Sequence, residues 1–336
     1  MAKRCDLERL KGLNKDLKLE FPEQKIPTRN GYGDALVELG KINKSVMVLC
    51  ADLTESTRVE KFREKFPKRF VEIGVAEQNL VTVASGLAAV GKIPFASSYA
   101  MFCPGRCWEQ IRTTICYNNQ NVKIIGAHSG VSVGPDGATH QALEDIAIMR
   151  ALPNMVVIVP ADYEQTKKAT HAIAKYKGPA YMRFAREKTP QFTTKSTEFK
   201  IGKAQVLKRG KDLAIIGAGP VVYECLEAAE MLERKGISAE VINCHTIKPL
   251  DKNTILSAAK KCGCVLTVEE AQIIGGLGGA ISELLSENWP TKIKRIGVRD
   301  HFGESGSPDE LLQKFGFSSK HIFKEAFKFC KCVKNN

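Results

Sequence analysis

The sequence lacks several features that would indicate particular classes of protein. No apolar run among its 336 residues is long enough to cross a bilayer, and the first residues lack the apolar core of a secretory signal. The eleven cysteines are scattered, and none of their close pairs has the C-x-x-C spacing of a zinc site. These absences favour a cytoplasmic protein with reduced thiols, no membrane association and no metal site of its own.

Basic charge is abundant, but it is not gathered in one block. The formal net charge is +13, and the lysines are spread along the chain without interleaved aromatics. Such a charge suits a nucleic-acid surface or small anionic substrates such as phosphorylated metabolites. With 43% hydrophobic and 26% charged residues, the composition is that of a soluble globular protein. Charge alone leaves both kinds of ligand open.

Apolar, β-branched segments alternate with amphipathic helical patterns over most of the chain. This alternation is typical of βαβ units and predicts parallel sheets covered on both faces. A polar stretch after Arg186 interrupts the pattern, and a second alternating series follows it. We therefore predict an α/β protein of two consecutive α/β domains, the second smaller, with these parts: an N-terminal arm (1–24), a first domain (25–190), a linker (191–202) and a second domain (203–336).

The residues that follow the predicted strands of the first domain are unusually polar. In open parallel sheets, ligands bind beyond the carboxyl ends of the strands, so these residues should lie along one edge. A single carboxylate at a helix start is usually a cap, and a single histidine after a strand is usually a loop residue. Together, however, the set favours a site for a polar anion: Asp52, Thr54, Ser56, Glu77, Ser97, Ser98, Tyr99, His128, Ser129, Asp136, His140, Arg183 and Arg186.

Glycine-rich turns in the second domain are weaker signals. IIGAGPVV (215–222) follows a predicted strand, but valine replaces the third glycine of a dinucleotide fingerprint. The GGLGG segment (275–279) is best explained as a turn that needs unusual backbone angles. We expect both to be structural.

Four motifs resemble the C-terminal half of transketolases: ADLTEST (51–57), VEIGVAEQN (71–79), HSGVSVGPDGATHQALEDIA (128–147) and TIKPLD (246–251). The resemblance covers residues 25 to 330 and implies a pyrimidine-binding domain followed by the family's C-terminal domain. The half of the family that holds the diphosphate of the cofactor and its Mg²⁺ has no counterpart in this sequence. The chain thus resembles the C-terminal subunit of a split transketolase.

The resemblance implies a role for individual residues. Glu77 matches the glutamate that bonds N1′ of the aminopyrimidine of thiamine diphosphate, and Phe102 matches the aromatic residue that stacks on this ring. The remaining expected cofactor-binding residues are Asp52, Tyr99 and Arg106. The substrate phosphate is expected at Arg29, Ser56, His128 and Arg186, and the sugar hydroxyls at Asp136 and His140. Glu77, His128 and His140 are expected to be catalytic, and no metal ligand is expected in this chain.

The implied reaction is transfer of a two-carbon ketol unit from a ketose phosphate to an aldose phosphate. The chain should need an N-terminal partner subunit that carries Mg²⁺, and the two should form a heterotetramer. Alternative interpretations are a deoxyxylulose-phosphate synthase-like enzyme, a 2-oxo acid dehydrogenase β subunit and a non-catalytic sugar-phosphate-binding partner. The DGATH loop with Arg29 and Arg186 disfavours a lipoamide-dependent enzyme, which needs no phosphate grip. Nucleic-acid binding has no motif behind it.

Overall fold

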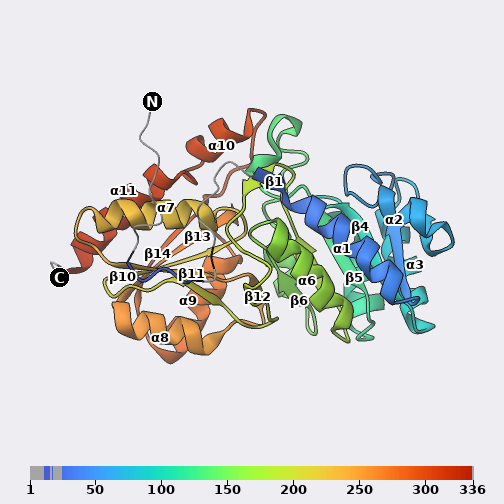
Figure 1. Ribbon diagram of the computed structural model, residues 1–336, viewed down its shortest axis with the longest axis horizontal. Helices are drawn as coiled ribbons and strands as arrows, with labels where there is room; N and C mark the ends of the chain where they lie inside the picture. The colour runs from blue at the N-terminus through green and yellow to red at the C-terminus, as the bar shows by residue number, and fades with distance from the viewer. Residues whose placement is uncertain (1–10, 16, 18–24, 335–336) are drawn as a thin grey trace.

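The computed structural model describes residues 11–15, 17 and 25–334, which form two α/β halves that lie side by side (Figure 1). Each half has its own largely parallel sheet with helices on both faces. The predicted fold class of two consecutive α/β domains is confirmed. No helix in the described part of the chain is both long and apolar enough to span a membrane.

The first half is built on a seven-stranded sheet of order β12-β6-β7-β5-β4-β2-β3. All neighbours pair in parallel except β12 with β6. Because both faces are covered, the central strands are almost entirely buried. The strands are β2 (Val46–Cys50), β3 (Phe70–Glu72), β4 (Ile93–Tyr99), β5 (Lys123–Ala127), β6 (Val156–Ile158), β7 (Ala180–Arg183) and β12 (Thr246–Lys248).

The helices of this half fall on opposite faces of the sheet. Helices α1 (Thr28–Ile42) and α6 (Tyr163–Lys175) lie together in front of the sheet in Figure 1, over an apolar core that includes Tyr32 and Phe95. The other face packs against α3 (Glu77–Ala89), α4 (Trp108–Gln110), the π-helical turn η4 (Ile111–Cys116) and α5 (Asp145–Arg150). A short helix, α2 (Glu60–Lys65), follows the loop after β2.

The second half has a five-stranded sheet of order β14-β13-β10-β11-β9, in which only β9 is antiparallel. Figure 1 shows α7 (Val222–Glu233) and α11 (Ser319–Lys334) on one side of this sheet, with α8 (Lys252–Cys262) and α9 (Leu277–Asn288) on the other. A further helix, α10 (Pro308–Lys314), lies near the first half. The strands are β9 (Gln205–Lys208), β10 (Leu213–Ala218), β11 (Ala239–Asn243), β13 (Cys264–Gln272) and β14 (Lys292–Val298).

Several elements were not predicted from the sequence. Strand β12 lies in the predicted second domain yet joins the first sheet, and β1 (Lys25–Pro27) pairs with β8 (Lys188–Pro190) beside the predicted linker. Within the N-terminal arm, Leu13 bridges to Lys208 of β9. Residues 1–10, 16 and 18–24 of the arm lie outside the described residues. These pairings connect positions far apart in the sequence, so no local pattern indicates them.

A buried ionic network joins the two halves. The Arg183 guanidinium lies 2.9 Å from an Asp145 carboxylate oxygen, and their side chains are only 4% and 1% exposed. Tyr181 donates a 2.6 Å hydrogen bond to the other Asp145 oxygen, and Arg183 also donates to the Glu270 carbonyl at the end of β13. Arg183 therefore belongs to this domain junction, and its predicted place among the ligand-facing residues is wrong. The alternation of side chains along β7 turns it toward the second half.

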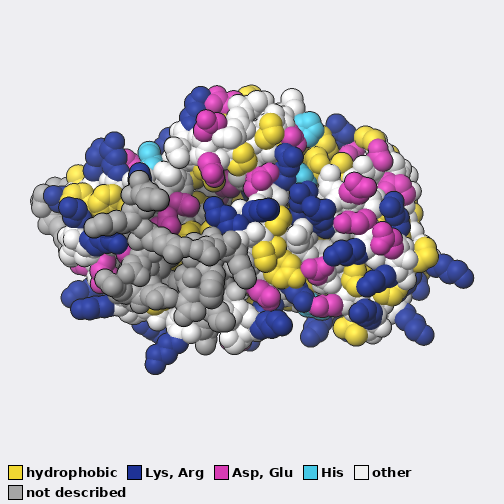
Figure 2. All heavy atoms as spheres, turned by 45° about the horizontal axis from the view of Figure 1, so that its top comes forward, with side chains coloured by type: hydrophobic (Ala, Val, Ile, Leu, Met, Phe, Trp, Pro, Cys, Tyr) yellow, Lys and Arg dark blue, Asp and Glu magenta, His cyan; other side chains and the backbone are white. Residues whose placement is uncertain are grey.

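Acidic side chains accompany the basic ones on the molecular surface. On the face shown in Figure 2, the lysine and arginine side chains of the described residues are interspersed with aspartate and glutamate. Several charges of the described structure are paired, for example Lys61 with Asp34 and Lys167 with Glu38. The surplus of positive charge is thus distributed, which agrees with its spread along the sequence.

Replacing Asp145 by alanine should strongly destabilise the chain. The Arg183 charge would remain buried without its partner, a loss of about 3–5 kcal/mol in the free energy of unfolding. Asp309→Ala, which removes an exposed carboxylate from α10, should cost less than about 1 kcal/mol. Urea denaturation of the two variants checks this, and similar midpoints for both would contradict the importance of the junction.

Candidate active site

The loop that follows β2 is organised by a carboxylate from the neighbouring strand. Glu72, at the end of β3, accepts a 2.7 Å hydrogen bond from the backbone N–H of Asp52 and a 3.0 Å bond from the Thr54 hydroxyl. Asp52 has a φ of 56°, in the left-handed region that non-glycine residues seldom adopt. This loop places Asp52 and Ser56 at the carboxyl edge of the sheet, as predicted.

Three arginines approach the same edge and form what we call the arginine group: Arg29, Arg58 and Arg186. Arg29, in the first turn of α1, donates a 3.0 Å hydrogen bond to the Ser56 carbonyl, so two predicted phosphate-binding residues are in contact. Burial lowers the pKa of Arg29, and the charges of Arg58 and Arg186 lower it further. Mutual repulsion of this kind marks a place where an anion would be favourable.

Arg58 was missed by the sequence analysis. It follows the ADLTEST motif directly and, like Asp52, has a left-handed φ, here 64°. Its Nε is buried without a hydrogen-bond partner in the described structure, and so is the Nε of Arg29. The signal that could have identified Arg58 is a basic residue two positions after Ser56, in the same strand-end loop.

Four rings form an aromatic cluster beside the arginine group: Tyr99, Phe102, His128 and His140. Tyr99 ends β4 and stacks on His128, with 4.0 Å between ring centroids. Phe102 stacks at 6.1 Å from Tyr99, and His140 meets the Phe102 ring edge-on at 5.3 Å. The structure thus brings together residues from three segments that the sequence predicted to share one edge. Tyr99, Phe102 and His140 remain partly exposed, so the cluster is open on one side.

His128 connects the aromatic cluster with the arginine group. It directly follows β5, is 1% exposed and has a φ of 55°. Burial lowers its pKa to about 3, with further lowering by Arg29, Arg186, Arg58 and His140. The ring is therefore neutral near pH 7. Its Nδ1 has no hydrogen-bond partner among the described residues, and neither does the buried hydroxyl of Ser98 on β4. Orphaned buried polar atoms of this kind need a partner that the described residues do not supply, such as a water, an ion or a ligand.

Glu77, the first residue of α3, is linked to the aromatic cluster through Arg106. Its side chain is 3% exposed, and its Oε2 lies 3.2 Å from Nη1 of Arg106. The Arg106 guanidinium carbon lies 4.3 Å from the centroid of the Phe102 ring. The carboxylate thus sits at the positive end of a helix, yet it is bonded to a side chain rather than to the helix N–H groups. A routine capping role does not explain this arrangement.

The loop that carries Asp136 and His140 is held by the second half of the chain. Ser132 N–H donates a 2.6 Å hydrogen bond to Glu270, and Gln141 donates a 2.8 Å bond to the Glu304 carbonyl. At Gly130, with φ 84°, a Cβ atom would lie only 2.3 Å from a Glu270 oxygen, so glycine is required there. Within the loop, Asp136 pairs with Arg186 at 3.2 Å.

Other charged clusters serve the framework. Glu269 accepts hydrogen bonds from the N–H groups of Leu277 and Gly278, so the GGLGG turn is the capped start of α9. Among residues 11–15, 17 and 25–334, no three His, Cys, Asp or Glu side chains are grouped so that they could hold a metal ion.

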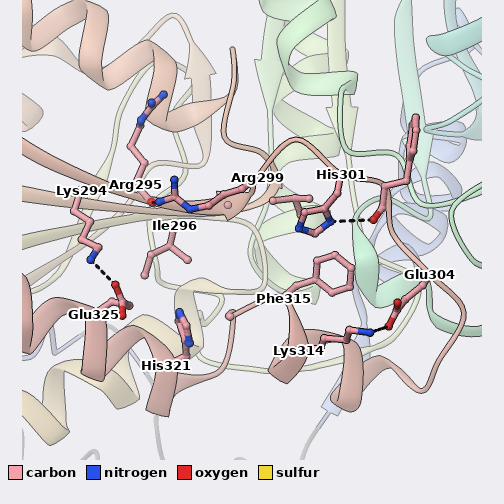
Figure 3. A pocket seen from close by; sticks show the side chains of 14 residues that line it. Lys294, Arg295, Ile296, Arg299, His301, Glu304, Lys314, Phe315, His321 and Glu325 are labelled. Atoms are coloured by element: carbon pink, nitrogen blue, oxygen red, sulfur yellow. Dashed lines mark hydrogen bonds and ion pairs between the residues drawn. The ribbon is translucent and has the colours of Figure 1, made fainter.

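A separate hollow of about 380 Å³ lies in the second half (Figure 3). Arg299, His301 and His321 border it, but both lysines at its rim are already paired, Lys294 with Glu325 and Lys314 with Glu304.

The residues at the sheet edge fit the pyrimidine part of thiamine diphosphate. A flat heterocycle needs an aromatic partner and a polar group for its ring nitrogen, and Phe102 and Glu77 offer both in a position open to solvent on one side. The chemistry of these groups is thus suited to that ring.

Comparisons with known proteins agree with this geometry. The family profile described as "Transketolase, pyrimidine binding domain" matches residues 24–191, and "Transketolase, C-terminal domain" matches residues 202–322. The chain is also similar to a solved structure titled "Split gene transketolase, inactive beta4 tetramer". The TM-score is 0.85 and the identity 46%, and the match covers 90% of this chain and 98% of that one.

Two curated relatives match along nearly their whole length. A protein of Methanocaldococcus jannaschii designated a transketolase C-terminal section is 50% identical over 299 residues, 88% of this chain and 94% of its own. The 6-deoxy-6-sulfo-D-fructose transketolase subunit SqwH of Clostridium sp. (strain MSTE9) is 42% identical over 298 residues, 89% and 92% of the two chains. The chain therefore belongs to the transketolase family, as a subunit that corresponds to the C-terminal section.

Proposed function

We propose that this chain is the C-terminal subunit of a split transketolase. With an N-terminal subunit, it would transfer a two-carbon ketol unit from a ketose phosphate to an aldose phosphate by means of thiamine diphosphate. The observation that carries the proposal is the arrangement at one sheet edge. Glu77 is linked through Arg106 to Phe102, and Phe102 shares the aromatic cluster with the neutral His128, whose pKa is lowered by the arginine group. The family membership and the similarity to a split-gene transketolase support it.

Glu77 would hold the ring nitrogen of the cofactor. Its burial makes a charge-assisted hydrogen bond strong, because little water competes for the carboxylate. Phe102 would stack on the ring, and Tyr99 and Asp52 would complete the pocket from this chain. When bound, thiamine diphosphate supplies a nucleophilic carbon and an electron sink. We assign the diphosphate and Mg²⁺ to the partner subunit.

The arginine group would bind the terminal anion of the substrate. Arg29 and Arg186 present planar guanidinium groups suited to a phosphate dianion, with Ser56 beside them. We add Arg58 to this set because its charge acts on the same site. Asp136, oriented by its 3.2 Å contact with Arg186, would contact substrate hydroxyls.

The two histidines would differ in role. His128 is neutral near pH 7, so it suits hydrogen bonding to substrate oxygen better than proton delivery. His140 is partly exposed at the mouth of the site, and its Nδ1 lies 2.9 Å from the Thr139 hydroxyl. We therefore assign proton transfer to His140 together with residues of the partner subunit. The open side of the aromatic cluster is where that subunit would close the site, in a proposed heterotetramer of two subunits of each kind.

The isolated chain should show no thiamine-diphosphate-dependent turnover, and mixing with its N-terminal partner should restore it. Xylulose 5-phosphate with ribose 5-phosphate is the first donor–acceptor pair to assay. A sulfonate-terminated ketose is the second donor, because the Clostridium relative is named for such a sugar. Full activity of the lone chain would refute the split-enzyme proposal, and pyruvate consumption with release of CO₂ would favour one of the alternative enzymes.

Glu77→Gln should lower kcat of the reconstituted complex by about 10²–10⁴-fold, the range typical of a lost proton-transfer group. The amide keeps the shape of the side chain but cannot exchange a proton with the ring nitrogen. Subunit assembly, followed by analytical ultracentrifugation, should be unchanged. A variant with near-normal kcat would show that Glu77 has no catalytic role.

Arg58→Ala should raise KM for a phosphorylated donor by about ten- to a hundredfold, as expected for one charge-assisted hydrogen bond. KM for the same sugar without its phosphate should not change, because the lost contact is to the anion. Arg63→Ala, which removes an equal charge from the exposed side of α2, is the matched control. An equal loss with both sugars would place Arg58 outside the anion site.

His128 should remain neutral in the folded chain between pH 5 and 8. Its pKa of about 3 lies below that of an unfolded histidine, near 6.5, so the folded state resists protonation. The resulting stability is present above pH 6.5 and declines as the pH falls below that value. Imidazole shifts of ¹⁵N-histidine-labelled protein check this, and a titration midpoint near pH 6.5 would disprove it.

A further inference from the structure

Arg106 makes two contacts at once within the candidate site. Its guanidinium lies over the Phe102 ring, with 4.3 Å from the guanidinium carbon to the ring centroid. Its Nη1 lies 3.2 Å from Oε2 of Glu77. The side chain of Glu77 is 3% exposed, whereas that of Arg106 is 53% exposed. An exposed cation thus reaches over an aromatic ring to a buried carboxylate.

The proposed site would use the same two groups, the Phe102 ring face and the Glu77 carboxylate, to bind an aminopyrimidine ring. Such a ring stacks flat on an aromatic side chain and bonds a carboxylate through a ring nitrogen. A guanidinium is also planar, stacks on aromatic faces and bonds carboxylates. The Arg106 guanidinium and an aminopyrimidine ring would therefore compete for the Phe102 face and the Glu77 oxygen.

We infer that Arg106 is a placeholder residue: in the lone subunit it occupies the position between Phe102 and Glu77 that the pyrimidine ring of the cofactor takes in the assembled enzyme. The inference rests on the proposed function and extends it. Arg106 is then a positioning residue whose side chain has to leave before the cofactor binds. Its high exposure leaves solvent-filled space into which the side chain swings.

The backbone around Arg106 is fixed, so the exchange involves the side chain alone. The turn η3 (Gly105–Cys107) is anchored by two fully buried cysteines, Cys103 and Cys107, whose sulfurs lie 3.7 Å apart. The Arg106 N–H donates a 2.9 Å hydrogen bond to the Phe102 carbonyl. Arg106 and Phe102 therefore keep their relative position, and only the long side chain is free to change.

The placeholder solves a problem of the unassembled subunit. Glu77 is buried next to apolar side chains, and a buried carboxylate without a cation or hydrogen-bond donor is costly. Arg106 supplies that cation until the cofactor arrives. The benefit carries a disadvantage, because Arg106 competes with the cofactor for its two partners. Removing Arg106 should therefore weaken the lone subunit and tighten cofactor binding.

Calorimetric titration of thiamine diphosphate with Mg²⁺ into the reconstituted complex tests the inference. Arg106→Ala should lower the Kd by about three- to tenfold, the gain from removing one competing cation–π and hydrogen-bonded contact. Arg106→Lys, which keeps the charge but stacks less well, should fall between alanine and wild type. Arg112→Ala, at an exposed arginine six residues along the chain, should leave the Kd unchanged.

Two further variants separate this inference from the proposed function. Glu77→Gln and Phe102→Ala should each raise the Kd; if neither does, the cofactor does not bind here and the proposed function fails. If both raise the Kd while Arg106→Ala raises it too or leaves it unchanged, the cofactor site stands and the placeholder inference is overturned.

The thermal midpoint of the lone subunit provides a second readout that does not depend on the cofactor. Arg106→Ala should lower the midpoint by about 1–2 °C, the shift expected for roughly 1 kcal/mol in a chain of 336 residues. In a Glu77→Gln background the same change should have a much smaller effect, because the charge pair is already absent. Equal shifts in both backgrounds would show that the two side chains are not coupled, and would overturn the inference.

Discussion

The buried ion pair between Arg183 and Asp145 is the interaction on which the rest of the site depends. It lies where β7 of the first sheet meets the end of β13 of the second, and Arg183 also bonds the Glu270 carbonyl there. Glu270 in turn fixes the backbone at Ser132, in the loop that carries Asp136 and His140. The position of that loop is therefore set by the contact between the halves. A second domain with few ligand-facing residues of its own still shapes the site.

The site combines two electrostatic environments that a single ligand would span. At one end, Glu77 is buried beside an aromatic ring, where a hydrogen bond to the carboxylate is strong because the dielectric is low. At the other, the arginine group concentrates positive charge around a neutral His128. Asp52, Arg58 and His128 all have left-handed backbone conformations, and such local strain persists where the surrounding structure imposes it. A cofactor ring at one end and a substrate anion at the other suit this polarity.

The open side of the aromatic cluster leaves the candidate site accessible to water. The proposed ketol transfer would need a site protected from water, and partly exposed Phe102 and His140 do not provide one. A partner subunit that covers this side would supply the protection and the missing cofactor contacts. In the assembly that we propose, division of one site between two chains would also account for an internal cation near Glu77 in the unassembled chain.

The sequence by itself determined the local elements and which residues would share an edge. Alternation of apolar strands with amphipathic helices predicted parallel sheets, and the residues after those strands included Glu77, His128 and Arg186, which the structure does place at one edge. Such patterns are local in the sequence, so the sequence alone is enough to predict them. The tertiary structure decided what these side chains contact. It turned Arg183 into the domain junction, brought the charge of Arg58 close to Arg29 and His128, and paired Arg106 with Glu77. It also kept His128 neutral, because burial and neighbouring charges arise only when distant segments pack together.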